Sequence, residues 1–409
     1  LLRRMTPLSW WLAGLGAVMA AGAIAGVIVF ARGLVVTNLT DLVPWGLWIT
    51  VDLSAIGLSA GAFLLAAAVY LLGWRRFEPV ARTATFLGLV GYSMAVLTLL
   101  LDIGRPDRFW HALVFWNPHS VLWEVTMCIT LYLGVLAIET APLFSRLEAV
   151  RGRFPRLADV LGRAHRLAPY LAIVGLGLSM LHQSSLGALY GVLKARPIWY
   201  RPDLSVLFIL SAAAAGPALT VLASMLAGRL DRRIRVDDDL MERLAHIVGW
   251  VLVGYLYFRF WDALSMSYTY EPGRTEGLQL LTRGQLAFNF WALEMALGAA
   301  IPIVLLLRRN LCRNRTLRMI ALALVVVGMV TYRWDTNLVG QLIVLRNLTG
   351  ETLVRYTAYV PSLVEMVSSA GIVAYGLMAS ILGVRYLGVV HHEVESHGEV
   401  VQEAATAVA

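Results

Sequence analysis

The chain has 409 residues, of which 59% are hydrophobic and only 15% are charged. This composition excludes a soluble globular domain and is typical of a protein that crosses a membrane many times. The formal net charge of +8 does not indicate nucleic-acid binding, because the basic residues lie in short loops between apolar segments. Two cysteines, Cys128 and Cys312, are too few for an iron–sulfur cluster, which needs about four thiolates.

Ten apolar segments are long enough to span a bilayer as helices, which satisfy their own backbone hydrogen bonds in lipid. We expect the first, after Arg3 and Arg4, to be a membrane helix, because it lacks the small-residue cleavage site of a signal peptide. We expect one polytopic domain over residues 1–390 and a polar cytoplasmic tail over 391–409. The predicted spans cover residues 9–30, 47–73, 84–101, 119–140, 168–191, 204–227, 244–263, 286–307, 318–340 and 362–387.

Basic residues divide unevenly between the two sides of these spans. Counted by the nearer side of the membrane, 22 of the 34 lysines and arginines belong to one side and 11 to the other, while Arg259 is left out as a residue within a span. The positive-inside rule makes the richer side cytoplasmic and therefore predicts that both termini are cytoplasmic. The outward loops 102–118 and 192–203 are rich in Trp, Phe and Pro, which suits interfacial anchoring and a docking surface.

Many ionisable residues inside the predicted spans lie in the half of the membrane nearer the outer face. A charge at mid-bilayer costs roughly 2.5–3.5 kcal/mol, so these residues indicate a polar functional site. Some of them, taken singly, also fit an ordinary position among the lipid headgroups. The set comprises Asp52, Asp102, Glu124, His182, Arg259, Asp262, Glu294, Arg333, Asp335 and Glu365.

Glu124, His182 and Glu294 lie deeper, where a headgroup position explains them less well. His182 begins the run HQSS, and four consecutive polar residues are costly in lipid. His182 and Gln183 could together hydrogen-bond a carbonyl ligand, although a lone histidine is also common as a packed, hydrogen-bonded residue. Arg259 and Asp262 are three residues apart, so we expect them to pair on one helix face.

The histidines argue against haem, because a haem b needs two axial ligands that are usually histidines on facing spans. Of the eight histidines, His182 and His246 lie well inside predicted spans, and they lie toward opposite faces. We therefore expect neither haem nor a metal site. A quinone fits better, since its tail favours lipid, its carbonyls need donors, and its reduction takes up protons that carboxylates and a histidine could move.

Several motifs follow one another in a recognisable order along nearly the whole chain. The most specific are NPHSVLWE at 117–124 and LHQSS at 181–185, together with PWGLWITVDL at 44–53, FRFWD at 258–262 and TYRWDTNLV at 331–339. In these motifs the chain resembles the polysulfide-reductase membrane-subunit family (NrfD/PsrC type), especially the HybB-type membrane subunits of periplasmic nickel–iron hydrogenases.

The resemblance implies an all-α integral membrane protein in which spans two to five and six to nine form two four-helix bundles, flanked by the first and last helices. It implies a menaquinone or ubiquinone site near the outer face of the first bundle, without haem. Electrons would pass through a periplasmic ferredoxin-like iron–sulfur subunit, served by a hydrogenase-like or molybdoenzyme-like catalytic subunit. The location would be a bacterial or archaeal cytoplasmic (inner) membrane.

The same resemblance implies roles for individual residues. A proton route is expected through Glu124, Glu294, Asp262, Arg333 and Glu365. Glu124 would also border the quinone site. The quinone would be bound around His182, Asp102, Asp52 and Trp45, with Gln183 next to His182.

Two alternatives to a redox subunit remain open at this stage. A secondary transporter or ion translocator without a redox role would also explain buried charges. A passive membrane anchor for an extracytoplasmic enzyme would leave the deeper polar residues unexplained. Within the redox interpretation, the segment 341–358 is longer than expected of the hydrogenase type, which leaves the identity of the catalytic partner open.

Overall fold

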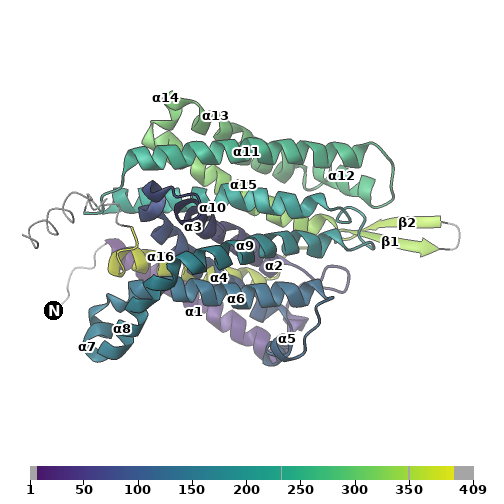
Figure 1. Cartoon of the computed structure of the whole chain (residues 1–409). Coiled ribbons are helices and arrows are strands. Elements are labelled where there is room, and N and C mark those ends of the chain that lie inside the picture. The colour runs from purple at the N-terminus through teal and green to yellow at the C-terminus, as the bar shows by residue number, and fades with distance from the viewer. Residues whose placement is uncertain (1–6, 232, 349–350, 391–409) are drawn as a thin grey trace, which may run out of the picture.

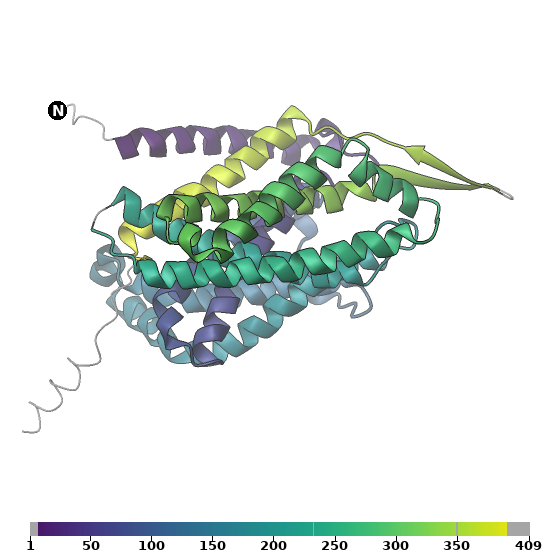
Figure 2. The same cartoon turned by 90° about the horizontal axis from the view of Figure 1, so that it is seen from above.

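The computed structural model describes residues 7–231, 233–348 and 351–390, so the predicted tail 391–409 lies outside the described residues. Long helices run side by side and a two-stranded hairpin extends from one end of them (Figures 1 and 2). Within the described residues, ten helices are long and apolar enough to cross a membrane. The all-α fold with ten spans is therefore confirmed.

Eight of the ten spans are single helices, and two are divided. The second span consists of α2 (Leu47–Ser59) and α3 (Gly61–Tyr70), and the eighth of the π-helix η5 (Asn289–Ala300) and α13 (Ile301–Leu307). The single-helix spans are α1 (Pro7–Arg32), α4 (Glu78–Asp102), α6 (Val121–Ser145), α9 (Ala168–Gly191), α10 (Asp203–Leu230), α11 (Asp238–Ser267), α15 (Arg315–Val339) and α16 (Leu363–Tyr386).

The largest boundary differences occur where a helix continues beyond its apolar part. The seventh span was expected over 244–263, whereas α11 begins six residues earlier, at Asp238. The side chain of Asp237 accepts hydrogen bonds from the backbone N–H groups of Asp239 and Leu240. This cap starts the helix outside the apolar segment, so hydropathy alone placed its beginning too late.

The division of the second span brings two backbones into close contact. A Cβ atom added to Gly61 would lie 2.3 Å from the carbonyl carbon of Gly216 in α10, and one added to Gly216 would lie 2.1 Å from the nitrogen of Gly61. Neither position accepts a side chain without a backbone shift. The uninterrupted apolar stretch 47–73 predicted one helix there, because hydropathy carries no information about such contacts.

We call spans two to five the first bundle and spans six to nine the second bundle. In the first bundle α4 packs against α2, α3 and α6, and α9 packs against α3 and α6. In the second bundle α11 packs against α10 and α13, and α15 packs against α10, η5 and α13. The two bundles meet where α10 contacts α9, α2 and α3, and where α15 contacts α2, while α1 packs on α16 and α16 on α4.

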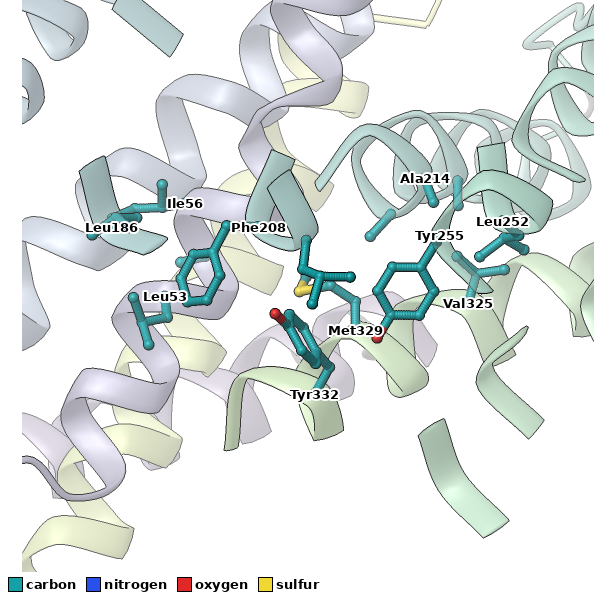
Figure 3. Close-up of a cluster of buried hydrophobic side chains, with 14 of the residues drawn as sticks. Leu53, Ile56, Leu186, Phe208, Ala214, Leu252, Tyr255, Val325, Met329 and Tyr332 are labelled. Carbon is teal, nitrogen blue, oxygen red and sulfur yellow. The ribbon is translucent and has the colours of Figure 1, made fainter. Parts of the chain in front are cut away.

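A continuous apolar core runs through both bundles (Figure 3). Leu53 of α2 and Leu186 of α9 belong to it on the first-bundle side, and Phe208 of α10 lies where the bundles meet. Tyr255 and Tyr332 continue the core into the second bundle, with their rings 5.7 Å apart. Polar side chains inside this core are therefore exceptions that need a partner or a function.

The two ends of the molecule differ in their surface elements. The arginine-rich end carries α7 (Glu148–Arg153), α8 (Pro155–Arg163) and α14 (Arg309–Cys312) (Figure 1). The hairpin end carries α5 (His111–Val114), α12 (Arg274–Thr282), β1 (Ile343–Leu348) and β2 (Glu351–Tyr356). β1 and β2 pair in antiparallel register with Ile343 opposite Tyr356. The sequence predicted only a long outward loop over 341–361, so the hairpin was missed.

Candidate quinone site

The deepest polar pair of the first bundle joins α4 to α9. The hydroxyl of Tyr92 lies 2.7 Å from Nδ1 of His182, and both side chains are fully buried. The ring of Tyr132 in α6 packs edge-on against Tyr92 with 4.3 Å between centroids. When Tyr92 donates this hydrogen bond, Nε2 of His182 carries the proton and is the atom that can donate to a further group.

Two carboxyl groups extend this polar region toward the hairpin end. Asp52 of α2 is 3% exposed, and Asp102 ends α4 with a partly exposed side chain. Asp52 lies close enough to both Asp102 and Tyr92 for electrostatic interaction. α2, α4 and α9 therefore bring Asp52, Asp102 and His182 to the same region, although these residues are far apart in the sequence.

Three atoms of this region share one property, and we call them the unpaired polar atoms. They are Nε2 of His182, Oδ1 of Asp52 and Oδ1 of Asp102, which are buried and have no hydrogen-bond partner among the described residues. More than nine-tenths of buried polar groups in proteins have a partner, and an unsatisfied one costs about 1–3 kcal/mol. Buried atoms without a partner also occur on Glu294, Arg333 and Asp335. The three atoms of the first bundle combine a ring nitrogen with two carboxyl oxygens, a set that suits a polar ligand group.

Glu124 and Gln183 lie on either side of this region and already have partners. The hydroxyl of Ser185 donates to Oε1 of Glu124 over 2.7 Å, which links α9 to α6. The amide nitrogen of Gln183 donates to the carbonyl of Ile56 over 3.1 Å, and its oxygen accepts from Arg333. Consecutive residues of a helix point about 100° apart, so Gln183 is directed away from the Tyr92 side of His182.

Trp45 belongs to an aromatic cluster at the hairpin end of the first bundle. Its ring lies 5.5 Å from that of Tyr190 and 5.9 Å from that of Trp199. Its carbonyl accepts hydrogen bonds from the side-chain amides of Asn337 and Gln341 over 3.0 and 2.7 Å. Tyr190 lies within electrostatic reach of Asp52 and Asp102, so this cluster borders the polar region.

Arg333 of α15 lies where the two bundles meet. Its Nη2 donates to the carbonyl of Phe208 over 3.0 Å, to Ser211 over 3.1 Å and to Gln183 over 3.3 Å. The guanidinium also stacks on the ring of Phe208, 3.7 Å from its centroid. In residues 7–231, 233–348 and 351–390 this fully buried cation forms no ion pair.

In the second bundle one group of buried charges around Arg259 is paired, whereas Arg333 and Asp335 of α15 form no ion pair among the described residues. Arg259 binds Asp262 at 2.6 Å and Glu294 at 2.9 Å, so the pairing expected from their spacing on α11 is confirmed for Asp262. Arg201, in the loop before α10, binds Asp262 at 2.5 Å. Tyr255 donates to Oε1 of Glu294 over 2.7 Å. Sequence reasoning missed both Arg201 and Tyr255 as members of this network.

Two further candidates have local partners. Asn289 donates to Oδ1 of Asp335 over 3.0 Å. Glu365 caps the start of α16, where its Oε2 accepts from the backbone N–H groups of Ser362 and Asn38 at 2.8 and 3.0 Å and its Oε1 accepts from Tyr359. Burial and this hydrogen bond raise the pKa of the Tyr359 hydroxyl above its usual range. Glu365 also lies within electrostatic reach of Asp102.

A family model for polysulphide reductase, NrfD, matches residues 35–345, which is most of the chain. The chain belongs to the NrfD family. The resemblance stated from the sequence motifs is thereby confirmed. Within the family, it is 34% identical over 397 residues to the menaquinone reductase integral membrane subunit of Nitratidesulfovibrio vulgaris, covering 94% of this chain and 92% of the relative.

Other NrfD relatives carry names from different respiratory enzymes. A probable Ni/Fe-hydrogenase 2 b-type cytochrome subunit of Escherichia coli is 28% identical over 372 residues, 88% of this chain and 86% of the relative. A selenate reductase subunit of Mesobacillus selenatarsenatis is 25% identical over 406 residues, 92% of this chain and 93% of the relative. The protein is therefore a multi-pass membrane protein of a family whose members serve oxidoreductase complexes. Because one relative is named a cytochrome subunit, the absence of haem stays a prediction.

Proposed function

We propose that this NrfD-family chain is the quinone-reactive subunit of a respiratory oxidoreductase complex in a bacterial or archaeal inner membrane. It exchanges electrons between a periplasmic ferredoxin-like iron–sulfur subunit and the menaquinone or ubiquinone pool. The observation that carries the proposal is the set of unpaired polar atoms on His182, Asp52 and Asp102 inside an apolar bundle. A quinone needs this combination, because its carbonyls accept hydrogen bonds while its tail favours apolar surroundings.

The chemistry of these residues fits the exchange of protons with a quinone. Nε2 of His182 donates to a quinone carbonyl, while Tyr92 holds the ring through Nδ1. The carboxyl groups of Asp52 and Asp102 supply the protons that reduction consumes when they are protonated, and accept those that oxidation releases when they are ionised. Asp102 is partly exposed at the end of α4, so it exchanges protons with the side on which the hairpin lies, and Glu365 lies near it.

We extend the proposal to proton translocation through the second bundle. Its support is the buried series Glu294, Arg259, Asp262 and Arg201, which leads from the core toward the loop before α10. Arg333 and Gln183 connect this bundle to the helix that carries His182. Reconstituted turnover should then generate a membrane potential larger than that expected from quinone chemistry. Turnover without this additional potential would mean that the second bundle does not translocate protons.

The names of the relatives support menaquinone as the substrate and leave two kinds of catalytic partner, hydrogenase-like and molybdoenzyme-like. In the proposed orientation the arginine-rich end and both termini are cytoplasmic, and the hairpin end is periplasmic. Mass spectrometry of the complex purified in mild detergent from its native membrane identifies the partner. Purification without a redox subunit, together with uptake of a solute or ion by the reconstituted chain, would favour the transporter alternative.

The test of the quinone site compares two membrane histidines. In His182→Gln we expect turnover with a soluble quinone analogue to fall by roughly 100-fold or more, the range ascribed to a positioned acid–base group. The matched control is His246→Gln, because the ring of His246 bonds the carbonyl of Leu306 in the second bundle. Both variants should keep the partner subunits and the helix content of the wild type. Undiminished turnover in His182→Gln would overturn the site.

A further inference from the structure

The hairpin leaves the bundle from a firmly held base. Nη1 of Arg196 donates to the carbonyls of Ile343 and Gly340 over 2.8 and 3.2 Å. The backbone N–H of Thr357 donates to the carbonyl of Leu342 over 2.8 Å, which closes the hairpin at its base. Beyond these contacts β1 and β2 extend away from the helices, roughly along their direction (Figures 1 and 2). A six-residue strand adds about 20 Å of reach.

The two faces of the hairpin differ in their surroundings. Residues that oppose each other in the register share a face, so Leu345 and Val354 lie on one face. Leu345 of this inner face lies against Gly273 at the start of α12, where an added Cβ would come within 3.1 Å of it. We call the opposite side the outer face, and its register pairs are Val344 with Arg355, Arg346 with Leu353 and Leu348 with Glu351.

The outer face carries two arginines and one glutamate, Glu351, so its formal charge is positive. Arg346 lies opposite Leu353 and Arg355 lies opposite Val344, so the two arginines are diagonal neighbours across the strands. Both are exposed, and neither forms an ion pair with any residue that the structure describes. Leu353 between them is 41% exposed. Like charges at this spacing repel each other. The positive-inside rule does not explain these two arginines, because it favours basic residues at the opposite, arginine-rich end.

An acidic protein surface complements the two exposed arginines and the leucine between them. Arginine pairs with carboxylates through two parallel hydrogen bonds and is enriched at protein interfaces. Val344 and Leu353 provide the apolar contact between the two charges. A lipid headgroup is the less suitable occupant, because the hairpin extends beyond the ends of the helices rather than along their sides (Figure 2). A two-stranded hairpin is also marginally stable by itself, so a partner surface stabilises it.

We propose that the outer face of the hairpin docks an acidic surface of the extramembrane iron–sulfur subunit. This inference rests on the proposed function, because that function supplies the partner. It adds the place of contact and the chemistry of the opposing surface. The binding is electrostatic at its periphery and weakens as salt screens the exposed charges.

The experiment purifies the tagged full-length chain from its native membrane in three forms: wild type, R346E/R355E and R346K/R355K. Quantitative mass spectrometry and iron analysis measure how much iron–sulfur subunit accompanies each chain. We expect R346E/R355E to lose the subunit by roughly tenfold or more, and R346K/R355K to retain most of it at low salt. The control R32E/R283E makes the same charge change at two exposed arginines outside the hairpin and should keep wild-type stoichiometry.

Two outcomes overturn the proposal, and they differ in what else they affect. If the wild type and R346E/R355E hold the same iron–sulfur subunit in equal amount, the hairpin does not dock it, while the proposed function stands. That result would mean that the arginines only protect the strand edges from unwanted pairing. If the wild type itself purifies without an iron–sulfur subunit, the proposed function fails and the docking inference fails with it.

Discussion

The candidate site in the first bundle and the Arg259 network in the second satisfy their buried polar groups differently. In the first, His182, Asp52 and Asp102 carry the unpaired polar atoms. In the second, Arg259 is paired with both Asp262 and Glu294. His182 and Asp52 are as deeply buried as Arg259 and Asp262, so burial does not separate the two kinds of residue. The difference lies in partners: the site around His182 keeps hydrogen-bonding capacity for a ligand, whereas Arg259 and Asp262 bind each other.

Removal of Arg259 should have the largest effect on stability. Arg259→Met leaves Glu294 and Asp262 buried with fewer partners, and breaking such a pair costs about 3–5 kcal/mol. The measurement is the free energy of unfolding in mixed detergent micelles, with Arg283→Met as an exposed control. A loss below about 1 kcal/mol would mean that the second-bundle network does not support the fold.

A matched pair of aspartates sharpens the comparison. Asp52→Asn should keep the thermal midpoint Tm, because Oδ1 of Asp52 has no hydrogen-bond partner to lose, yet quinone turnover should fall by roughly 100-fold, because an amide does not exchange the proton. Asp262→Asn should lower Tm, since both Arg259 and Arg201 lose an ionised partner. Equal losses of Tm in the two variants would remove the proposed distinction between the bundles.

The contact between the bundles should matter to an intermediate degree. Gln183→Leu deprives Arg333 of one acceptor and the carbonyl of Ile56 of its donor, for an expected loss of about 1–3 kcal/mol. Quinone binding should persist, because His182 keeps its bond to Tyr92. Titration with a fluorescent quinone analogue measures this binding, and complete loss of it would place Gln183 in the quinone site itself.

The smallest effect is expected at Ser185. Its hydroxyl bonds both Glu124 and the carbonyl of Leu181, so Ser185→Ala removes one link between α9 and α6 but leaves the helix intact. We expect a loss of about 1 kcal/mol in stability and less than a tenfold change in turnover. A larger change in turnover, measured in parallel with His182→Gln, would mean that Glu124 takes part directly in the quinone site.

Hydropathy was sufficient to predict the spans, but it could not predict how the backbones meet. Gly61 and Gly216 approach each other closely where the second span is divided, and both glycines lie within apolar sequence that predicts continuous helix. The hairpin was missed for a related reason, because its strands are only six residues long and lie within a loop. Local composition does not encode contacts between distant segments.

The candidate site was predictable where charge is costly. His182 and Asp52 were identified because ionisable groups are rare in membrane spans. Tyr92 was missed, since a tyrosine in an apolar helix gives no signal until its partner is known. Glu365 was assigned to the proton route because it is a carboxylate within a span, and this assignment stays a prediction. Its cap on α16 was not predicted, because a buried carboxylate gives no sequence signal of the backbone groups that it binds.

The most direct test of the account is photo-crosslinking with an azido-menaquinone in the purified complex, followed by peptide mapping. The account predicts labelled peptides from α2, α4 and α9 around Asp52, Tyr92 and His182, with labelling reduced by excess natural menaquinone and in His182→Gln. Labelling confined to α11 or η5, near Glu294, would contradict the central claim, because it would place the quinone beside the Arg259 network, in which Arg259 is already paired with Asp262 and Glu294.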